Sequence, residues 1–172
     1  QRSGRIPAVS PTPMLRIRPA TVGDAMAVSA LVLPLAREVV DAPDATAFLA
    51  TLGPDGMFER LASPRFAGLL AEDGSGACGI ILMRDTTHLY HLFVRRDRQG
   101  LGIARRLWRA MTGAGGSAQG APARFTVNST PSAVEVYRRL GFEATAQMQH
   151  SDGISFLPMA CERPLNACPV TR

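Results

Sequence analysis

The sequence predicts a single α+β domain in which helices cover a mostly antiparallel sheet. Three apolar runs of strand length follow one another at residues 65–71, 78–83 and 88–94, which indicates an antiparallel meander. Apolar residues then recur with helical spacing at 104–111 and again at 133–140. With 172 residues, of which 46% are hydrophobic, the chain is long enough for one core and short for two.

The N-terminal residues divide into an extension and a first strand. Residues 1–13 contain three prolines and few side chains that could pack. We expect an extension that is disordered or left over from expression, with Met14 as the native start and one domain over residues 14–172. Residues 15–18 alternate apolar with polar side chains, as a half-buried strand does, and Pro19 ends the alternation.

Helical patterns come next. Asp24 is a candidate N-cap for a helix that continues through Leu35, and Pro34 is predicted to kink or end it. Residues 42–63 are helical in part, with an interruption at the Gly-Pro-Asp-Gly sequence of residues 53–56.

The C-terminal part is predicted to add a strand, a helix and a hairpin. The strand covers residues 124–128, and Thr130 and Pro131 form the N-cap and first-turn pair of a helix that stops at Gly141. The hairpin is expected from strands at 142–148 and 154–159 that are joined across residues 151–153.

Charge and cysteine content restrict the class of protein. Nineteen basic residues against fourteen acidic ones give a net charge of +5, which favours anionic partners such as nucleic acid, acidic protein or a phosphorylated cofactor. The three cysteines form no C-x-x-C pair, so we expect no disulfide framework, no metal and a reducing cytoplasm. No stretch approaches the roughly 18 apolar residues of a membrane span, which predicts a soluble protein without a membrane partner.

A glycine-containing loop at residues 99–104 has the properties of a phosphate cradle. Gly100 and Gly102 let the backbone approach a ligand closely, and the amides that open the following helix favour an anion. The loop is not a Walker A motif, because no Gly-Lys-Ser or Gly-Lys-Thr follows. It also fails the G-x-G-x-x-G dinucleotide pattern, since Arg105 occupies the place of the third glycine.

The same loop resembles the Q/R-x-x-G-x-G/A signature of the GNAT superfamily of N-acetyltransferases. Gln99, Gly102 and Ala104 match that signature position for position. The sequences Val-Asn-Ser-Thr-Pro-Ser-Ala at 127–133 and Tyr-Arg-Arg-Leu-Gly-Phe at 137–142 are similar to the family's second conserved block. Two blocks in the right order are far more specific than either alone.

The resemblance implies a sheet of six to seven strands that splays between the fourth and fifth strands, flanked by about four helices. Acetyl-CoA would enter the gap, with its pantetheine amides on the edge of the fourth strand and its pyrophosphate on the amides of residues 100–105. The implied cofactor-binding residues are Leu92, Phe93, Val94, Gln99, Gly100, Leu101, Gly102, Ile103, Ala104, Arg105, Asn128 and Arg139. Arg138 is an alternative phosphate ligand, and a solvated helix face is the other interpretation of each arginine.

The resemblance also implies the catalytic groups. Tyr137 stands where the family's general acid stands, and its other interpretation is a core tyrosine on an apolar helix stripe. His88 matches the position at which some members place a catalytic glutamate, and a strand residue in the core or cleft is the alternative. Simple alternation places Tyr90 on the face of His88 and His91 on the opposite face. Arg96 departs from the proline common in the family, which predicts a change in loop stiffness.

The function predicted from these residues is transfer of an acetyl group from acetyl-CoA to a primary amine, by direct attack in a ternary complex. An alternative is a catalytically silent acyl-CoA-binding regulatory module, which needs the same loop but not a catalytic Tyr137. A nucleic-acid footprint formed by the arginines at 95, 96, 98, 105, 106 and 109 ranks last, because no nucleic-acid motif accompanies it. The identity of the acceptor amine and the oligomeric state, a homodimer included, stay open.

Overall fold

The fold is built on one mixed sheet, described by a computed structural model for residues 14–40, 45–113 and 123–163. The expected extension at residues 1–13 lies outside this description. The strands are β1 (Arg16–Pro19), β2 (Phe66–Asp73), β3 (Gly76–Arg84), β4 (His88–Val94), β5 (Ala123–Ser129), β6 (Glu143–Ala144), β7 (Gln149–Ser151) and β8 (Ile154–Arg163). The α-helices are α1 (Ala25–Arg37), α2 (Thr46–Ala50), α3 (Pro54–Ala62), α4 (Ile103–Gly113) and α5 (Val134–Arg139), with short 3-10 helices η1 (Val22–Asp24), η2 (Arg96–Arg98) and η3 (Pro131–Ala133).

The sheet follows the order β1-β2-β3-β4-β5-β8-β6, and β7 extends it as a hairpin partner of β8. Every pairing in it is antiparallel except that of β4 with β5, which is parallel. The α+β class and the antiparallel meander are therefore confirmed. The short β7 adds to the expected strands. The interruption predicted at residues 53–56 is wrong in its extent, because Pro54 is already the first residue of α3.

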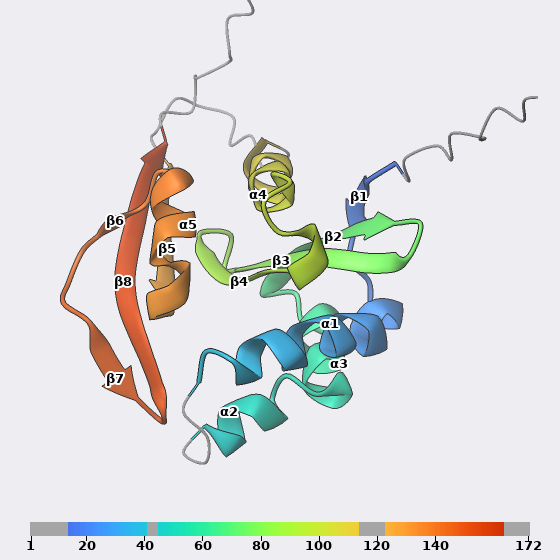
Figure 1. The fold of residues 1–172 in the computed structure, drawn as a ribbon, viewed down its shortest axis with the longest axis horizontal. Coiled ribbons are helices and arrows are strands. Elements are labelled where there is room, and N and C mark those ends of the chain that lie inside the picture. Colours follow the sequence, from blue (N-terminus) through green and yellow to red (C-terminus); the bar gives the residue numbers. More distant parts are fainter. Residues whose placement is uncertain (1–13, 41–44, 114–122, 164–172) are drawn as a thin grey trace, which may run out of the picture.

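Helices cover both faces of the sheet (Figure 1). On one face α4 packs over a core that includes Ile81, Leu89 and Trp108. On the other face α1 and α3 enclose a second core, with Val28, Met57 and Leu82 among its buried residues. The alternation along β3 divides Ile81 from Leu82 in this way, since neighbouring strand residues face opposite sides. No helix among the described residues has the length and apolar character needed to cross a membrane.

The first helix differs from its prediction in two respects. Pro34 lies inside α1 and does not end it, because Pro34 faces solvent while Val32 and Ala36 bury the opposite side of the helix. Asp24 precedes α1 but does not cap it with its side chain. Its carboxylate accepts a hydrogen bond from the Thr21 N–H at 2.7 Å and pairs with Arg18 at 2.8 Å.

The predicted strand at 142–148 is wrong in its extent. Only Glu143 and Ala144 pair with β8, and the Thr145 N–H then donates to the Pro158 carbonyl oxygen. The hairpin itself is confirmed, since β7 and β8 pair across Asp152 and Gly153. Both turn residues have positive φ, at 52° and 74°, which suits a tight two-residue turn.

Trp108 joins α4 to the half of the sheet beyond β4. It is 1% exposed, and its ring lies 5.1 Å from that of Phe125 on β5 and 5.2 Å from that of Phe142. We expect Trp108→Ala to lower the free energy of unfolding by about 3–5 kcal/mol, because it leaves a cavity among these rings. Urea titration of both proteins measures the difference.

Met26→Ala on α1 is the matched control, because Met26 is 70% exposed. It should change the unfolding free energy by less than about 0.5 kcal/mol. Equal effects of the two substitutions would contradict the role given to Trp108.

Candidate functional site

The strands β4 and β5 separate after only two paired positions. His88 pairs with Thr126 and Leu89 with Val127, and no later residue of β4 pairs with β5. Residues 91–94 therefore keep β3 as a partner on one edge, while the other edge of residues 90–94 faces a gap within the described part of the sheet. In Figure 1 this gap separates β1–β4 from the half that contains β5 and β8. Such an edge offers main-chain donors and acceptors to an extended ligand.

A β-bulge at Tyr90 changes which side chains face which core. Leu82 pairs with His91 and Met83 with Leu89, so Tyr90 is an extra residue on β4. The predicted placement of His91 on the face opposite Tyr90 is wrong, because the two rings lie 4.6 Å apart. Leu89, Leu92 and Val94 contact the α4 core, whereas Tyr90 and Phe93 pack against the α1–α3 core.

The loop after β4 presents its backbone at the end of that free edge. Gln99 fixes the start of the loop, since its Nε2 donates to the Val94 carbonyl oxygen at 3.0 Å. Gly100 and Gly102 have φ values of +76° and +78°, a region that favours glycine. A Cβ at either position would meet nothing within 4 Å, so backbone conformation and not crowding calls for glycine here.

The helix α4 opens directly from this loop. Its first hydrogen bond joins the Arg106 N–H to the Gly102 carbonyl oxygen at 3.0 Å, and Ile103 anchors the turn by burying its side chain. Leu101 is 66% exposed, Ala104 is half-buried and Arg105 is exposed. The N–H groups of the first turn have no partner within a helix, so this end of α4 favours an anion.

The arginines before the loop are used within the fold. Arg98 and Arg95 both pair with Asp73 on β2, at 2.5 and 3.3 Å. Hydrogen bonds from Ser75 and then from Arg98 lower the pKa of that carboxyl. Arg96 pairs with Glu38, just beyond the end of α1. The substitution of the family's usual proline by Arg96 thus adds an ion pair between the loop and α1.

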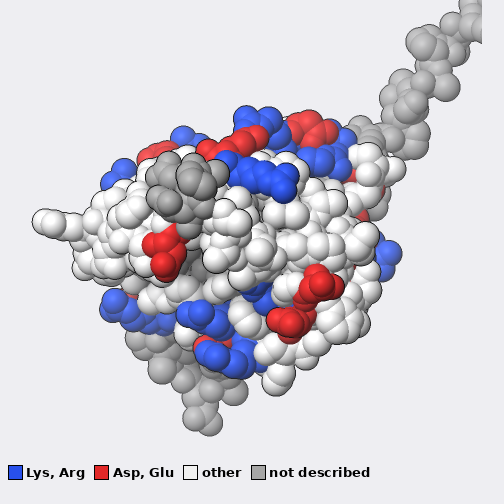
Figure 2. Space-filling view, turned by 90° about the horizontal axis from the view of Figure 1, so that it is seen from below, with Lys and Arg blue, Asp and Glu red and all other residues white. Residues whose placement is uncertain are grey.

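This pairing weakens the nucleic-acid interpretation. On the face seen from below the view of Figure 1, which is the side of α1 to α3, basic and acidic side chains lie beside one another and do not form one basic field (Figure 2). Arg105, Arg106 and Arg109 are exposed along α4 and have no ion pair within the described residues. They are the arginines that remain available to an anionic ligand near the loop.

Tyr137 lies in the core that α4 covers. Its side chain is 7% exposed, and its ring lies 5.7 Å from that of Phe142 in an edge-on contact. Burial raises the pKa of this phenol, so the hydroxyl stays protonated at every physiological pH and can act as a proton donor. The core and acid interpretations of Tyr137 are therefore compatible.

His88 stands at the point where β4 and β5 separate. Its Nδ1 lies 2.8 Å from Oγ1 of Thr126, which fixes the ring across the strand pair. Burial lowers the pKa of His88, and the charge of Arg84 lowers it further against the opposing effect of Asp85. The imidazole is therefore neutral at pH 7 and able to accept a proton.

The remaining predicted residues lie around the gap or on the surface next to it. Asn128 is exposed on β5, one position beyond its last pairing with β4. Arg139 on α5 is exposed and pairs with Glu135 at 3.4 Å, as a solvated helix face does. No three His, Cys, Asp or Glu side chains of the described residues gather in a metal-binding group.

The sequence interpretation missed three polar neighbours of this site. Thr126 orients His88, Arg84 is the direct cross-strand neighbour of His88, and Arg60 on α3 reaches the ring of Tyr90. Thr126 and Arg84 lie in strands without any motif, so only the pairing of β4 with its neighbours identifies them. Arg60 lies in the helical region of residues 42–63, where no motif indicates any chemistry.

Comparison with known proteins gives a consistent result. Residues 35–163 match the family model described as "Acetyltransferase (GNAT) domain". No curated protein sequence matches the chain significantly. Among solved structures, the chain is similar to a GCN5-related N-acetyltransferase from Rhodopseudomonas palustris, with a TM-score of 0.70, 19% identity, and coverage of 93% of this chain and 100% of that one.

Two further structures are similar. The PaiA N-acetyltransferase from Thermoplasma acidophilum, solved in complex with coenzyme A, gives a TM-score of 0.66 and 12% identity over 87% of this chain and 99% of that one. Nourseothricin acetyltransferase gives a TM-score of 0.56 and 19% identity over 87% of this chain and 99% of that one. At these identities the solved structures establish the fold, and the family model, which spans most of the chain, establishes the family. The chain belongs to the GNAT family of acetyltransferases.

Proposed function

We propose that the protein transfers an acetyl group from acetyl-CoA to a primary amine by direct attack within a ternary complex. The observation that carries this proposal is the free edge of β4 at residues 90–94, which ends at the amides of the loop and of α4. An extended ligand with amides at one end and phosphates at the other matches this arrangement, in which a free strand edge leads to the amides of a helix N-terminus. The complex of the structurally similar PaiA protein with coenzyme A supports the same donor.

The donor site is assembled mainly from main-chain atoms. In the proposal, pantetheine amides bond to the β4 edge around Leu92 and Val94 as an added strand would. The pyrophosphate lies on the amides of residues 100–105, at the positive end of α4. Arg105 supplies a charged donor at that end, and Asn128 faces the ligand from the β5 side of the gap.

The reaction needs one proton acceptor and one proton donor. The neutral amine attacks the thioester carbonyl carbon, a C–N bond forms, and the C–S bond breaks as sulfur leaves with its electron pair. His88 accepts the ammonium proton, for which its lowered pKa and its fixed ring suit it. Tyr137 donates to the departing sulfur, since burial keeps its phenol protonated.

Release of free coenzyme A from acetyl-CoA across a panel of amines tests the proposal as a whole. Turnover with at least one primary amine, and an N-acetylated product by mass spectrometry, is the expected result. If the protein binds acetyl-CoA and turns over no amine, the catalytically silent binding module replaces the enzyme. Absence of any acetyl-CoA binding would refute both.

The backbone at Gly102 gives a first specific prediction. Alanine in the left-handed region costs about 1–2 kcal/mol, so in Gly102→Ala the loop should relax from the conformation that directs its amides. We expect the Kd for coenzyme A, measured by calorimetry, to rise about tenfold. Gly76→Ala is the matched control, because Gly76 also has positive φ and open space but lies in the β2–β3 hairpin. A similar loss of affinity for coenzyme A in both variants would contradict the assignment of this loop as the pyrophosphate site.

The hydroxyl of Tyr137 gives a second prediction. Tyr137→Phe keeps the buried ring and removes only the proton donor, so kcat should fall about 10²–10⁴-fold. The Kd for acetyl-CoA should change less than about twofold, since the proposed donor contacts are main-chain atoms and Arg105. Stopped-flow or colorimetric detection of the free thiol measures the rate. Full activity in this variant would remove Tyr137 from the mechanism.

The ionisation of His88 gives a third prediction. A lowered pKa means that the base stays neutral down to a pH below 6.5 and is lost by protonation below that. Protonation of the amine substrate affects the wild type and His88→Gln equally, so the ratio of their kcat/KM values removes its contribution to the pH dependence. We expect this ratio to be level above pH 6.5 and to decline towards acid pH. A ratio independent of pH would exclude His88 as the base.

A further inference from the structure

Two arginines of different elements converge on the ring of Tyr90. The Cζ atoms of Arg60 on α3 and Arg84 on β3 each lie 5.3 Å from the ring centroid. Arginine over an aromatic face is a stabilising contact, but it does not neutralise the charge. Both cations thus lie beside β4, on the face away from α4.

Neither charge is fully compensated by the residues that the structure describes. The Nε of Arg84 is buried without a hydrogen-bond partner, and its nearest carboxylate oxygen, on Asp85, is 3.7 Å away. That carboxylate is already bound at 2.6 and 2.9 Å by Arg65. The Arg84 side chain as a whole is 37% exposed, so an anion that reaches its guanidinium group would gain a charge-assisted hydrogen bond.

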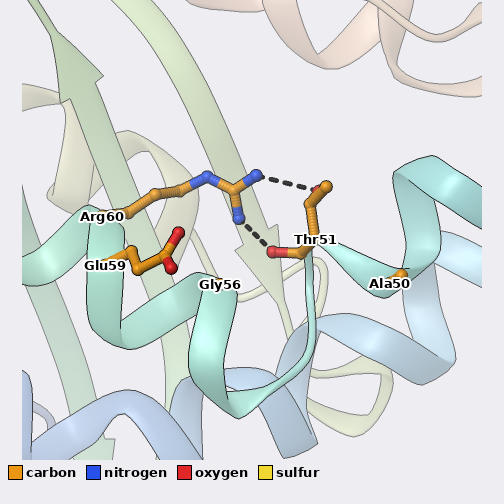
Figure 3. Close-up of a pocket in the computed structure, with 5 residues that line it drawn as sticks. All are labelled: Ala50, Thr51, Gly56, Glu59 and Arg60. Atoms are coloured by element: carbon orange, nitrogen blue, oxygen red, sulfur yellow. Dashed lines mark hydrogen bonds between the residues drawn. The ribbon is translucent and has the colours of Figure 1, made fainter.

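Arg60 has only uncharged hydrogen-bond partners. It donates to the carbonyl oxygen of Thr51 and to Oγ1 of the same residue, the latter at 2.9 Å. These contacts close one side of an open pocket of about 380 Å³, which Ala50, Gly56 and Glu59 also line (Figure 3). The pocket therefore adjoins the Tyr90 ring through Arg60.

The position of Arg84 relative to His88 links this charge to the proposed reaction. Arg84 and His88 are paired across β3 and β4, and side chains at such paired positions have Cβ atoms about 4.5–5.5 Å apart. A group bound by Arg84 would therefore lie beside the ring that accepts the amine proton. A planar carboxylate suits the planar donors of the guanidinium.

We infer that the acceptor is an amine that carries a carboxylate next to its nitrogen, as a free α-amino acid does, and that Arg84 binds this carboxylate. The inference rests on the proposed acetyl transfer. Arg84 binds the carboxylate so that the neighbouring nitrogen lies within reach of His88, and the side chain of the amino acid extends towards the pocket beside Arg60. The reaction itself is unchanged: the nitrogen gains the acetyl group and the sulfur of coenzyme A leaves.

Matched acceptors test this inference directly. For aliphatic, aromatic, acidic and basic side chains, kcat/KM is measured for the free amino acid, its carboxamide and the decarboxylated amine. One charged hydrogen-bonded pair gives a preference of about ten- to hundredfold for the free amino acid in the wild type. A peptide N-terminus resembles the carboxamide, so the same panel separates free amino acids from peptides. Equal use of all three forms would overturn the inference.

Variants then assign the preference to Arg84. In Arg84→Gln the free amino acid and its carboxamide should be used within about twofold of each other, through a rise in KM for the free acid. Arg84→Lys should restore part of the preference, because it keeps the charge and loses the planar donors. Arg124→Gln is the matched control: Arg124 is 58% exposed, pairs with Glu162 and lies on β5. If Arg84→Gln lowers kcat/KM equally for the free amino acid and its carboxamide, Arg84 only stabilises the fold and does not bind the carboxylate.

A variant that should increase the preference for the free amino acid keeps the test valid if Arg84→Gln misfolds. Asp85→Asn removes the carboxylate that competes for Arg84, so the preference for the free amino acid should increase, by up to about fivefold. A decrease would overturn the inference. If no amine is turned over at all, the acetyl-transfer proposal fails, and the carboxylate site is decided by calorimetric titration of free amino acid and carboxamide. Saturable binding of the free acid that Arg84→Gln abolishes would support the site, and absence of binding would reject it.

Discussion

The structure depends on one restriction of main-chain pairing, the separation of β4 from β5 after two residue pairs. If the two strands paired throughout, the edge of residues 90–94 would be covered by β5 and the loop at 99–102 would end on a closed sheet. Trp108, packed on Phe125 and Phe142, holds the second half of the sheet in place while the strands diverge. The family fold, established by the match over residues 35–163, is thus a way to keep a strand edge open within one mixed sheet.

The arginine-rich segment after β4 shows how charge serves two separate purposes. Arg95 and Arg98 bind Asp73 in the β2–β3 hairpin, and Arg96 binds Glu38, so these three side chains fix the loop from the outside. At Gly100 and Gly102 a Cβ would meet nothing within 4 Å, so the backbone of the loop stays accessible there. In the proposed complex, positive charge for the anionic ligand would come from the end of α4 and from the exposed Arg105.

The sequence predicted those parts that local chemistry determines. The bounds of β4, the loop at 99–104 and the turn at Asp152 and Gly153 all follow from short-range patterns, and the structure contains them. The bulge at Tyr90 was not predictable, because it depends on how β4 aligns with Leu82 and Met83. The helix α1 continues through Pro34 because its other face is buried, which no propensity of proline reveals. Catalytic roles for His88 and Tyr137 remain predictions.

The bulge at Tyr90 has a consequence for the evolution of such a protein. It separates β4 into side chains that pack under α4 and side chains that face α1 and α3, while the exposed edge consists of main-chain atoms alone. Recognition of the donor by that edge would survive replacement of almost any side chain along it. If the proposed sites are right, selection can therefore alter Tyr90, His91 or their arginine neighbours, and with them the acceptor, at little risk to the binding of the common donor.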